Sequence, residues 1–266
     1  MDIGLMGFGK TGRAVASILL ESKETTLQWV IRNSKNLEHR SVPEFLGVES
    51  CEPGFIYSRD EFSAEELIDN NPVEAIIDFS SESGIEYYGE EARKRRIAII
   101  TAISSYNPEK MEYLKEISKD TQVVCSPNIT IGINFLIIAA KILKNIAPYT
   151  DIEIIEEHFK DKPEISGTAK RIADSLELPE DSIKTVRAGG IIGVHEILFG
   201  FPHQTVRLKH ESISREAFGN GILFIARHIR DKKNGFYTME DLLLPYFKIN
   251  TPAEELSSKP WWKVWN

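Results

Sequence analysis

The sequence predicts an α/β protein of two domains: an N-terminal doubly wound parallel sheet, then an α+β domain with a mixed sheet. From residue 1 to about 126, short β-type apolar runs alternate with longer helical patterns, the order of strands and crossover helices in a parallel sheet. After Pro127 one long helical run precedes several short strand-like runs. A chain of 266 residues is long enough for both domains.

The first domain, residues 1–126, is expected to alternate strand and helix. The helix starts are legible: Ser63 with Glu66 forms a capping box, and Asn107 precedes Pro108, a favoured first helical residue. The expected strands are 3–6, 27–31, 75–77, 97–100 and 122–125, and the expected helices are 13–20, 64–68, 85–95 and 109–117. This order is typical of a doubly wound sheet.

The second domain is assigned to residues 127–235, and residues 236–266 are expected to pack back on the first domain. A helix is expected at 131–147 and another at 215–232, with strands at 152–157, 185–187, 194–199 and 205–210. Residues 251–266 carry three of the four tryptophans. We expect this segment either to dock on the body of the protein or on a partner subunit, or to be an extended tail held by a few aromatic contacts.

Composition excludes several classes of protein. The net charge of -8 is unsuited to nonspecific binding of nucleic acid, which needs a basic surface. The longest apolar run, residues 135–140, is too short to span a membrane. Cys51 and Cys125 are far apart and not in a metal-binding spacing. We therefore expect a soluble cytoplasmic protein with no disulfide and no metal site.

A glycine-rich turn joins the first expected strand to the first expected helix. It consists of Gly7, Phe8, Gly9, Lys10, Thr11 and Gly12 and fits the pattern G-x-G-x-x-G. Glycines allow a tight turn and close approach of a pyrophosphate, whose charge meets unpaired N–H groups at the helix N-terminus. Such turns also occur only to let a helix pack on a sheet. In this position the motif predicts a Rossmann-type dinucleotide site.

The end of the second strand bears on which dinucleotide binds. An NAD site usually has an acidic residue there, whereas this chain has Arg32, Ser34 and Lys35. Basic and polar side chains favour the 2′-phosphate of NADPH, although NADH remains possible and the residues could simply be solvated.

Loops after later strands should meet the same cofactor, because ligands of open α/β sheets lie at the carboxyl ends of the strands. Each loop could also be an ordinary turn. The residues assigned to the cofactor in these loops are Phe79, Ser80, Thr101, Ala102, Ile103, Ser126 and Asn128.

Three kinds of chemistry are gathered between residues 153 and 169. An apolar strand ends at His158, a cation follows at Lys162, and Ser166, Gly167 and Thr168 open a helix. Histidine titrates near neutrality and is the commonest general acid or base. A cation with helix N-terminal donors suits a carboxylate. The segment predicts a site for a small anionic substrate, while His195 and His210, in strands, are expected to be structural.

These residues resemble the dihydrodipicolinate reductase family, NAD(P)H-dependent enzymes of the diaminopimelate route to lysine. The family pattern is a strand ending in Glu, a His-His pair, a Lys four residues after the first His, and a Ser-Gly-Thr-Ala turn. His158, Lys162 and residues 166–169 match it. The resemblance extends over nearly the whole chain, including the glycine loop, residues 128–134, residues 193–196 and residues 214–221.

The resemblance implies hydride transfer from NADPH to an unsaturated cyclic dicarboxylate. His158 would supply or relay the proton, Lys162 would pair with a carboxylate or stabilise developing charge, and residues 166–168 would hold a carboxylate. Arg215 matches a position that approaches the substrate. The family is usually tetrameric through the second-domain sheet, so a homotetramer is expected.

The chain departs from the family pattern at several places. Phe159 replaces the second His, where it would line the substrate, the loop before Ser166 is one residue shorter, and the family's Gly-Thr-Thr-Gly turn has become Thr101-Ala102-Ile103-Ser104. Two alternatives follow. Phe159 is compatible with a reductase of another cyclic imine or enamine acid. The altered turn and the Trp-rich segment are compatible with a noncatalytic NADPH-binding regulatory or assembly protein.

Overall fold

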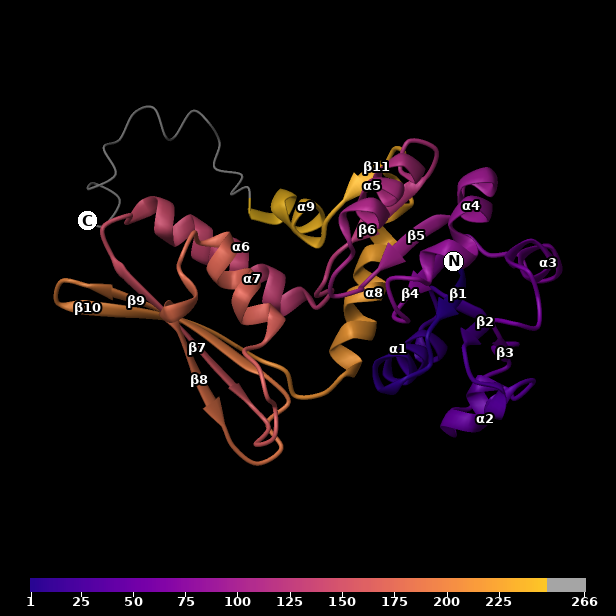
Figure 1. The fold of residues 1–266 in the computed structure, drawn as a ribbon, viewed down its shortest axis with the longest axis horizontal. Helices are drawn as coiled ribbons and strands as arrows, with labels where there is room; N and C mark the ends of the chain where they lie inside the picture. The colour runs from indigo at the N-terminus through magenta and orange to yellow at the C-terminus, as the bar shows by residue number, and fades with distance from the viewer. Residues whose placement is uncertain (248–266) are drawn as a thin grey trace.

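The computed structural model describes residues 1–247, so the prediction for the Trp-rich segment 251–266 lies outside the described residues. The predicted fold class is confirmed. A seven-stranded parallel sheet in the order β11-β6-β5-β4-β1-β2-β3 forms one lobe, and a four-stranded mixed sheet in the order β10-β9-β7-β8 forms the other (Figure 1).

The large sheet is built from short strands that are mostly buried on both faces, because helices cover both sides. Its strands are β1 (Asp2–Met6), β2 (Thr26–Arg32), β3 (Phe55–Ser58), β4 (Ala75–Asp78), β5 (Ala98–Thr101), β6 (Gln122–Cys125) and β11 (Gly235–Tyr237). The two edge strands, β3 and β11, were not predicted. β11 pairs with β6 more than a hundred residues away in sequence, so local sequence carries little sign of it.

The helices of this lobe begin where the caps predicted. Ser63 and Glu66 form the capping box, and Asn107 caps the helix that starts at Pro108. The helices are α1 (Lys10–Glu21), α2 (Val42–Leu46), α3 (Ala64–Asn70), α4 (Ile85–Arg95), α5 (Pro108–Ile117), α8 (Glu216–Ile229) and α9 (Met239–Leu243), with 3₁₀ turns at Lys35–Leu37 and Leu244–Phe247; a further 3₁₀ turn, Glu180–Ser182, belongs to the other lobe. Among the described residues, the structure has no helix whose length and apolar character would let it cross a membrane.

The small sheet is covered on one face by two helices, which lie side by side over it in Figure 1. Its strands are β7 (Asp151–His158), β8 (Ile183–Arg187), β9 (Val194–Phe201) and β10 (Gln204–Glu211), and its helices are α6 (Ile131–Ile146) and α7 (Gly167–Ser175). β8 runs parallel to β7, whereas β9 is antiparallel to both β7 and β10. Ile137, Ile154, Ile172 and Phe199 meet in the core beneath.

Helix α8 returns from the small sheet and packs against α1. Its residues Ile222 and Ile225 join the core of the large sheet. Glycines permit the approach: a Cβ at Gly219 would lie 2.6 Å from Ile18, and one at Gly221 would overlap the carbonyl oxygen of Ile129. The division of the chain at residues 126 and 235 stays a prediction.

The close packing of α8 predicts that one added methyl group destabilises the protein. Gly221→Ala should lower the free energy of unfolding by about 1–3 kcal/mol, because backbone at Ile129 must move to relieve the overlap. Urea unfolding of the variant measures this, and Gly190→Ala, where nothing lies within 4 Å of the added Cβ, is the matched control. Equal stability of the two variants would contradict the close packing.

Candidate active site

The glycine loop leaves open space at Gly9, beside the start of α1. Gly7 has φ +95°, a left-handed conformation that favours glycine, and a Cβ there would lie 2.8 Å from the backbone of Phe79. A Cβ on Gly12 would overlap the carbonyl oxygen of Gly7, while one on Gly9 would meet nothing within 4 Å. The first turn of α1 contains no acidic residue and its N-cap makes no side-chain hydrogen bond, so the loop fits an anionic group.

Two adjoining pockets extend from this loop along the carboxyl edge of the large sheet and share Phe79, Ser80 and Ser81. The first, of about 330 Å³, is lined by residues including Gly7, Phe8, Gly9, Arg32 and Ser34. The second, of about 410 Å³, is lined by residues including Thr11, Ala102, Ile103 and Phe218. Most of the residues predicted for the cofactor therefore lie around one continuous hollow.

Other predicted cofactor residues do not line these two pockets. Gly12 is buried beneath the loop, and Thr101 is fully buried with its hydroxyl 2.7 Å from that of Tyr106. Ser126 is also buried and donates a hydrogen bond to the Asn128 carbonyl. Lys35 belongs to a 3₁₀ turn beyond the pocket. Gly12, Thr101 and Ser126 thus lie beneath the loops, whereas Lys35 is exposed.

A buried carboxylate, which the sequence did not single out, shapes the shared wall of the two pockets. Asp78 accepts hydrogen bonds from the backbone N–H of Ser80 at 2.7 Å, from the Ser80 hydroxyl at 2.6 Å and from the Tyr88 hydroxyl at 2.9 Å. Burial raises the pKa of Asp78, and these donors oppose the rise. The carboxylate thus fixes the turn after β4 that carries Phe79 and Ser80.

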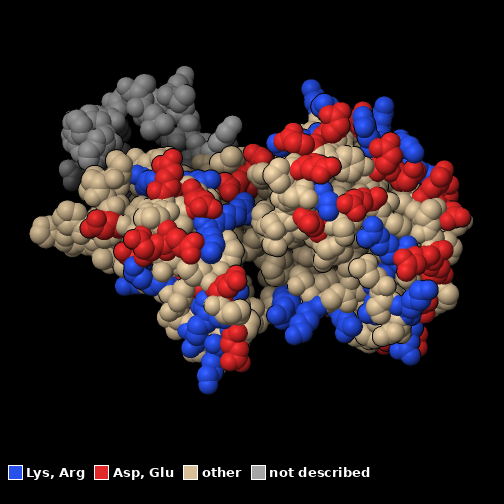
Figure 2. Space-filling model, in the orientation of Figure 1, with Lys and Arg blue, Asp and Glu red and all other residues tan. Residues whose placement is uncertain are grey.

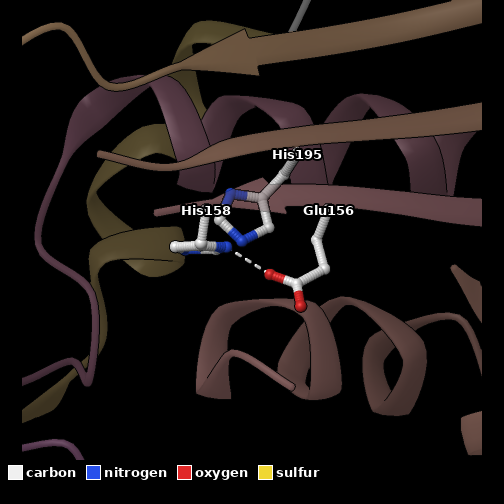
Figure 3. A group of neighbouring side chains, drawn as sticks. All are labelled: Glu156, His158 and His195. Atoms are coloured by element: carbon white, nitrogen blue, oxygen red, sulfur yellow. Dashed lines mark ion pairs between the residues drawn. The ribbon is translucent and has the colours of Figure 1, made fainter. Parts of the chain in front are cut away.

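The small-sheet end of the site contains three buried side chains that point toward one another (Figure 3). Glu156 and His158 lie on the same face of β7, because side chains alternate along a strand. His195 of β9 stands opposite Glu156 in the antiparallel register. Nδ1 of His158 pairs with the Glu156 carboxylate, and the two imidazole rings have centroids 5.4 Å apart.

The charge of Glu156 is balanced by the protein itself. Nη2 of Arg187 lies 2.6 Å from the carboxylate of Glu156, which is completely buried. Donor atoms of Glu156, His158 and His195 all lie within 4.8 Å of one another, a spacing that a metal ion also accepts. Because the guanidinium already neutralises the carboxylate, we interpret the cluster as a hydrogen-bonded network.

Burial and neighbouring charges set the protonation of the two histidines. The pKa of His158 lies below its ordinary value, mainly because burial disfavours the cation; Glu156 opposes this effect, and Lys162 and Arg187 add to it. Burial lowers the pKa of His195 to about 3, with smaller contributions from His158, His210 and Lys162. His195 is therefore neutral near pH 7.

The residues predicted to hold a carboxylate lie at the start of α7. Ser166 is the N-cap: its Oγ accepts a hydrogen bond from the Ala169 N–H at 3.0 Å and lies 2.9 Å from Nε2 of His195. Gly167 opens the helix, and a Cβ there would meet nothing within 4 Å. The Thr168 hydroxyl accepts a 3.3 Å hydrogen bond from Asn128. This contact connects the small-sheet site to the loop after β6.

Arg215 and Lys10 line a third pocket, of about 390 Å³, together with Arg13, Ile192 and Ser214. It joins the glycine-loop side of the large lobe to the loop between β8 and β9. Ile192 precedes Gly193, and a Cβ on Gly193 would lie 3.2 Å from Nε2 of His158. Figure 2 shows the surface hollowed where the two lobes meet, with basic side chains on both sides of the hollow.

Sequence reasoning missed the partners of His158. Glu156 could have been found, because residues two apart in a strand lie on the same face and Glu156 is two residues before His158. Nothing in the local sequence pointed to Arg187, some thirty residues later. His195 was expected to be structural, and its contact with Ser166 places it in the candidate site. Phe159, in contrast, is 42% exposed and is not part of this buried network.

Comparisons with known proteins identify the family of the chain. Residues 1–129 match the family model for dihydrodipicolinate reductase, N-terminus, and residues 128–243 match the model for its C-terminus. A 4-hydroxy-tetrahydrodipicolinate reductase of Clostridium perfringens is 31% identical over 263 residues, covering 88% of this chain and 94% of that protein. The chain belongs to the dihydrodipicolinate reductase family.

Two further relatives agree with this assignment. A 4-hydroxy-tetrahydrodipicolinate reductase of Caldanaerobacter subterraneus subsp. tengcongensis is 35% identical over 194 residues, covering 64% of this chain and 76% of that protein. The solved structure of a dipicolinate-bound dihydrodipicolinate reductase from Paenisporosarcina sp. TG-14 matches with a TM-score of 0.73 at 19% identity, covering 90% of this chain and 97% of that one. This structural likeness confirms the fold.

As a member of the dihydrodipicolinate reductase family, the chain is an NAD(P)H-dependent oxidoreductase. Its large lobe is the nucleotide-binding Rossmann domain of that family. The open space at Gly9 and the two pockets along the sheet edge fit such a cofactor.

The open space above Gly9 predicts a substitution that weakens cofactor binding without affecting folding. Gly9→Ala should raise the Kd for NAD(P)H about tenfold or more, because its methyl group would occupy the place of the pyrophosphate, while the melting temperature stays the same. Fluorescence titration and thermal unfolding measure the two quantities. Unchanged affinity in a folded variant would show that the pyrophosphate lies elsewhere.

Proposed function

We propose that this protein reduces an unsaturated cyclic dicarboxylate with NADPH, as the 4-hydroxy-tetrahydrodipicolinate reductase of the diaminopimelate route to lysine. The observation that carries the proposal is the pairing of a Rossmann pocket with a buried His158, beside Lys162 and the N-terminus of α7. Family membership supplies the reaction type. The substrate is that named for the relatives.

A dicarboxylate is recognised by donors from three places. Ser166 and the free N–H groups at the start of α7 offer hydrogen bonds to one carboxylate, and Lys162 offers a cation. Arg215 supplies a second cation from the far side of the hollow between the lobes. A ring held at both carboxylates would be oriented toward the second cofactor pocket. The bound cofactor supplies a hydride.

His158 supplies the proton that accompanies the hydride. Its Nδ1 is turned toward Glu156, which leaves Nε2, beside Gly193, as the nitrogen that can serve the substrate. In the free protein the pKa of His158 lies below its ordinary value. A dianionic substrate offsets the positive charge of Lys162 and so raises that pKa. Substrate binding thereby favours the protonated form of His158.

NADPH is the proposed cofactor, with NADH as a weaker one. Arg32 and Ser34 line the first pocket at the end of β2, where a 2′-phosphate would lie, and Lys35 follows directly in the chain. Asp78, at the end of β4 two strands away, already accepts hydrogen bonds from Ser80 and Tyr88. A guanidinium matches a phosphate by two parallel hydrogen bonds.

The direct test is oxidation of NADPH by purified protein while the dihydrodipicolinate precursor is generated in situ. We expect turnover, and we expect His158→Ala and Lys162→Ala each to reduce kcat/KM by about a hundredfold or more, since proton transfer and charge stabilisation are lost. Lys160→Ala is the matched control, because Lys160 is an exposed cation in the same loop.

Absence of turnover with both NADPH and NADH would refute the lysine-pathway assignment. If the variants bound cofactor normally and turnover never appeared with any substrate, a noncatalytic NADPH-binding role would take its place.

A second candidate, reduction of another cyclic imine or enamine acid, is favoured by Phe159. Its ring is exposed beside the site where the family has a second histidine. A panel of cyclic imino acids distinguishes the two functions. If only the lysine precursor reacts, the second candidate is excluded.

The position of Arg32 predicts a shift in cofactor preference. Arg32→Ala should raise the KM for NADPH by about ten- to a hundredfold, because the variant loses hydrogen bonds to a charged phosphate. The KM for NADH should stay nearly unchanged. Steady-state kinetics with each cofactor measure this. Arg40→Ala, an exposed arginine nearby in sequence, is the control. Equal losses with both cofactors would contradict a 2′-phosphate contact.

A homotetramer in the cytoplasm stays part of the proposal. The face of the small sheet opposite α6 and α7 carries partly exposed apolar residues, Val186, Ile155 and Leu198, among charged ones. Association of such faces would cover them.

A further inference from the structure

The functional part of the small sheet rests on one buried acidic residue. Glu156 has no exposed surface, although a carboxylate is costly to bury without compensation. One of its oxygens lies 2.6 Å from Nη2 of Arg187, and the carboxylate also pairs with Nδ1 of His158. The residue that compensates the charge and the residue that would move the proton thus share one carboxylate.

Arg187 also holds the loop that carries Lys162. Its Nε donates to the carbonyl oxygen of Lys162 at 3.1 Å, and its Nη2 donates to that of Glu164 at 2.9 Å. Glu164 is two residues before the N-cap Ser166. The Arg187 guanidinium therefore connects two parts of the site. It binds the Glu156 carboxylate, which pairs with His158, and it binds the loop that leads into the N-terminus of α7.

We propose that Glu156 and Arg187 are positioning residues: Glu156 fixes the tautomer and proton affinity of His158, and Arg187 fixes the Lys162 loop. The proposal deepens the proposed function and rests on it for the catalytic meaning of His158. Neither residue touches the substrate in this assignment; both act through groups that do.

The hydrogen-bond roles follow from the chemistry of each group. An ionised carboxylate only accepts, so Glu156 requires a proton on Nδ1 of His158. In the neutral ring, Nε2 then carries the lone pair and faces Gly193. When the ring is protonated, Nε2–H is the bond that can be broken, and the imidazolium remains paired with Glu156. The arrangement leaves the exchangeable proton on Nε2, beside Gly193 and away from Glu156.

Every charged or titratable neighbour of His158 bears on its proton affinity. Glu156 on β7 favours the cation, while Lys162 in the following loop and Arg187 on β8 oppose it. His195 on β9 is neutral near pH 7 and directs its Nε2 to Ser166. Glu156 is therefore the group whose removal should weaken proton binding.

Glu156→Gln has a predictable effect on the tautomer. Arg187 can only donate, so the Gln carbonyl must face it, and the Gln NH₂ group then faces Nδ1 of His158. Nδ1 must accept, and the proton of the neutral ring moves to Nε2. The loss of the negative charge also lowers the His158 titration midpoint by about one pH unit or more.

The decisive measurement is histidine-labelled NMR on the full chain, which needs no substrate. In the wild-type protein, the neutral His158 ring should carry its proton on Nδ1; a proton on Nε2 would overturn the proposal. Glu156→Gln should switch the tautomer and lower the midpoint. Glu157→Gln, on the opposite face of β7, is the matched control and should change neither.

Kinetics then connect the measurement to catalysis. If His158 must be protonated, activity falls as pH rises through its pKa, so in Glu156→Gln the fall of kcat/KM should move to lower pH by the same amount as the NMR midpoint. An unchanged pH profile beside a shifted midpoint would overturn the catalytic part. Absence of turnover in the wild type would refute the proposed function alone, because the NMR result stands without it.

The role of Arg187 is tested separately. Arg187→Lys keeps a charge near Glu156 but cannot make three directed hydrogen bonds, so the KM for substrate should rise about tenfold while the His158 midpoint stays near the wild-type value. Arg187→Ala should be partly restored by added guanidinium, and Arg207→Ala, an exposed arginine on β10, is the control.

A KM unaffected by Arg187→Lys, or a loss in Arg187→Ala that guanidinium does not reduce, would overturn the assignment of the loop. If Glu156→Gln fails to fold, Glu156→Asp replaces it: the shorter carboxylate should keep the Nδ1 proton but lower the midpoint, and an unchanged midpoint would count against the proposal.

Discussion

The cost of burying a charge is the constraint around which the small-sheet site is arranged. Glu156 lies within the sheet and has no contact with solvent, so it needs both a cation and donors. Arg187 from β8 supplies the cation, and His158 from its own strand supplies a donor. Because the same guanidinium holds the Lys162 loop, satisfying one buried carboxylate also arranges the groups that would meet a substrate.

The large lobe satisfies a different constraint, close approach of backbone to backbone. Gly7 passes the turn after β4 at a distance that leaves no room for a Cβ, and Gly12 lies against the glycine loop itself. These approaches put the start of α1 beside the Asp78-centred turn, so the two pockets form one hollow. The lobes are connected by α8, whose glycines allow it to sit against α1.

Much of the architecture was predictable because it depends on local signals. Alternation of buried strands with amphipathic helices predicted the parallel sheet, and caps at Ser63 and Asn107 predicted helix starts. The edge strands β3 and β11 were not predicted, since they have only four and three residues, and the partner of β11 is also distant in sequence. In the candidate site, residues 158–168 were legible because they are consecutive. Arg187 and the role of His195 were not, because strand pairing alone brings them there.

The sequence by itself determined the fold class, the N-terminal cofactor-binding loop and the type of chemistry. Each of these depends on residues that are close together in the chain, and the spacing of such residues has a direct physical meaning. Only the tertiary structure decided which groups control His158. A parallel register sets Arg187 beside β7 and an antiparallel register sets His195 opposite Glu156. Register is chosen by the burial of whole strand faces in the core, so no short segment could reveal it.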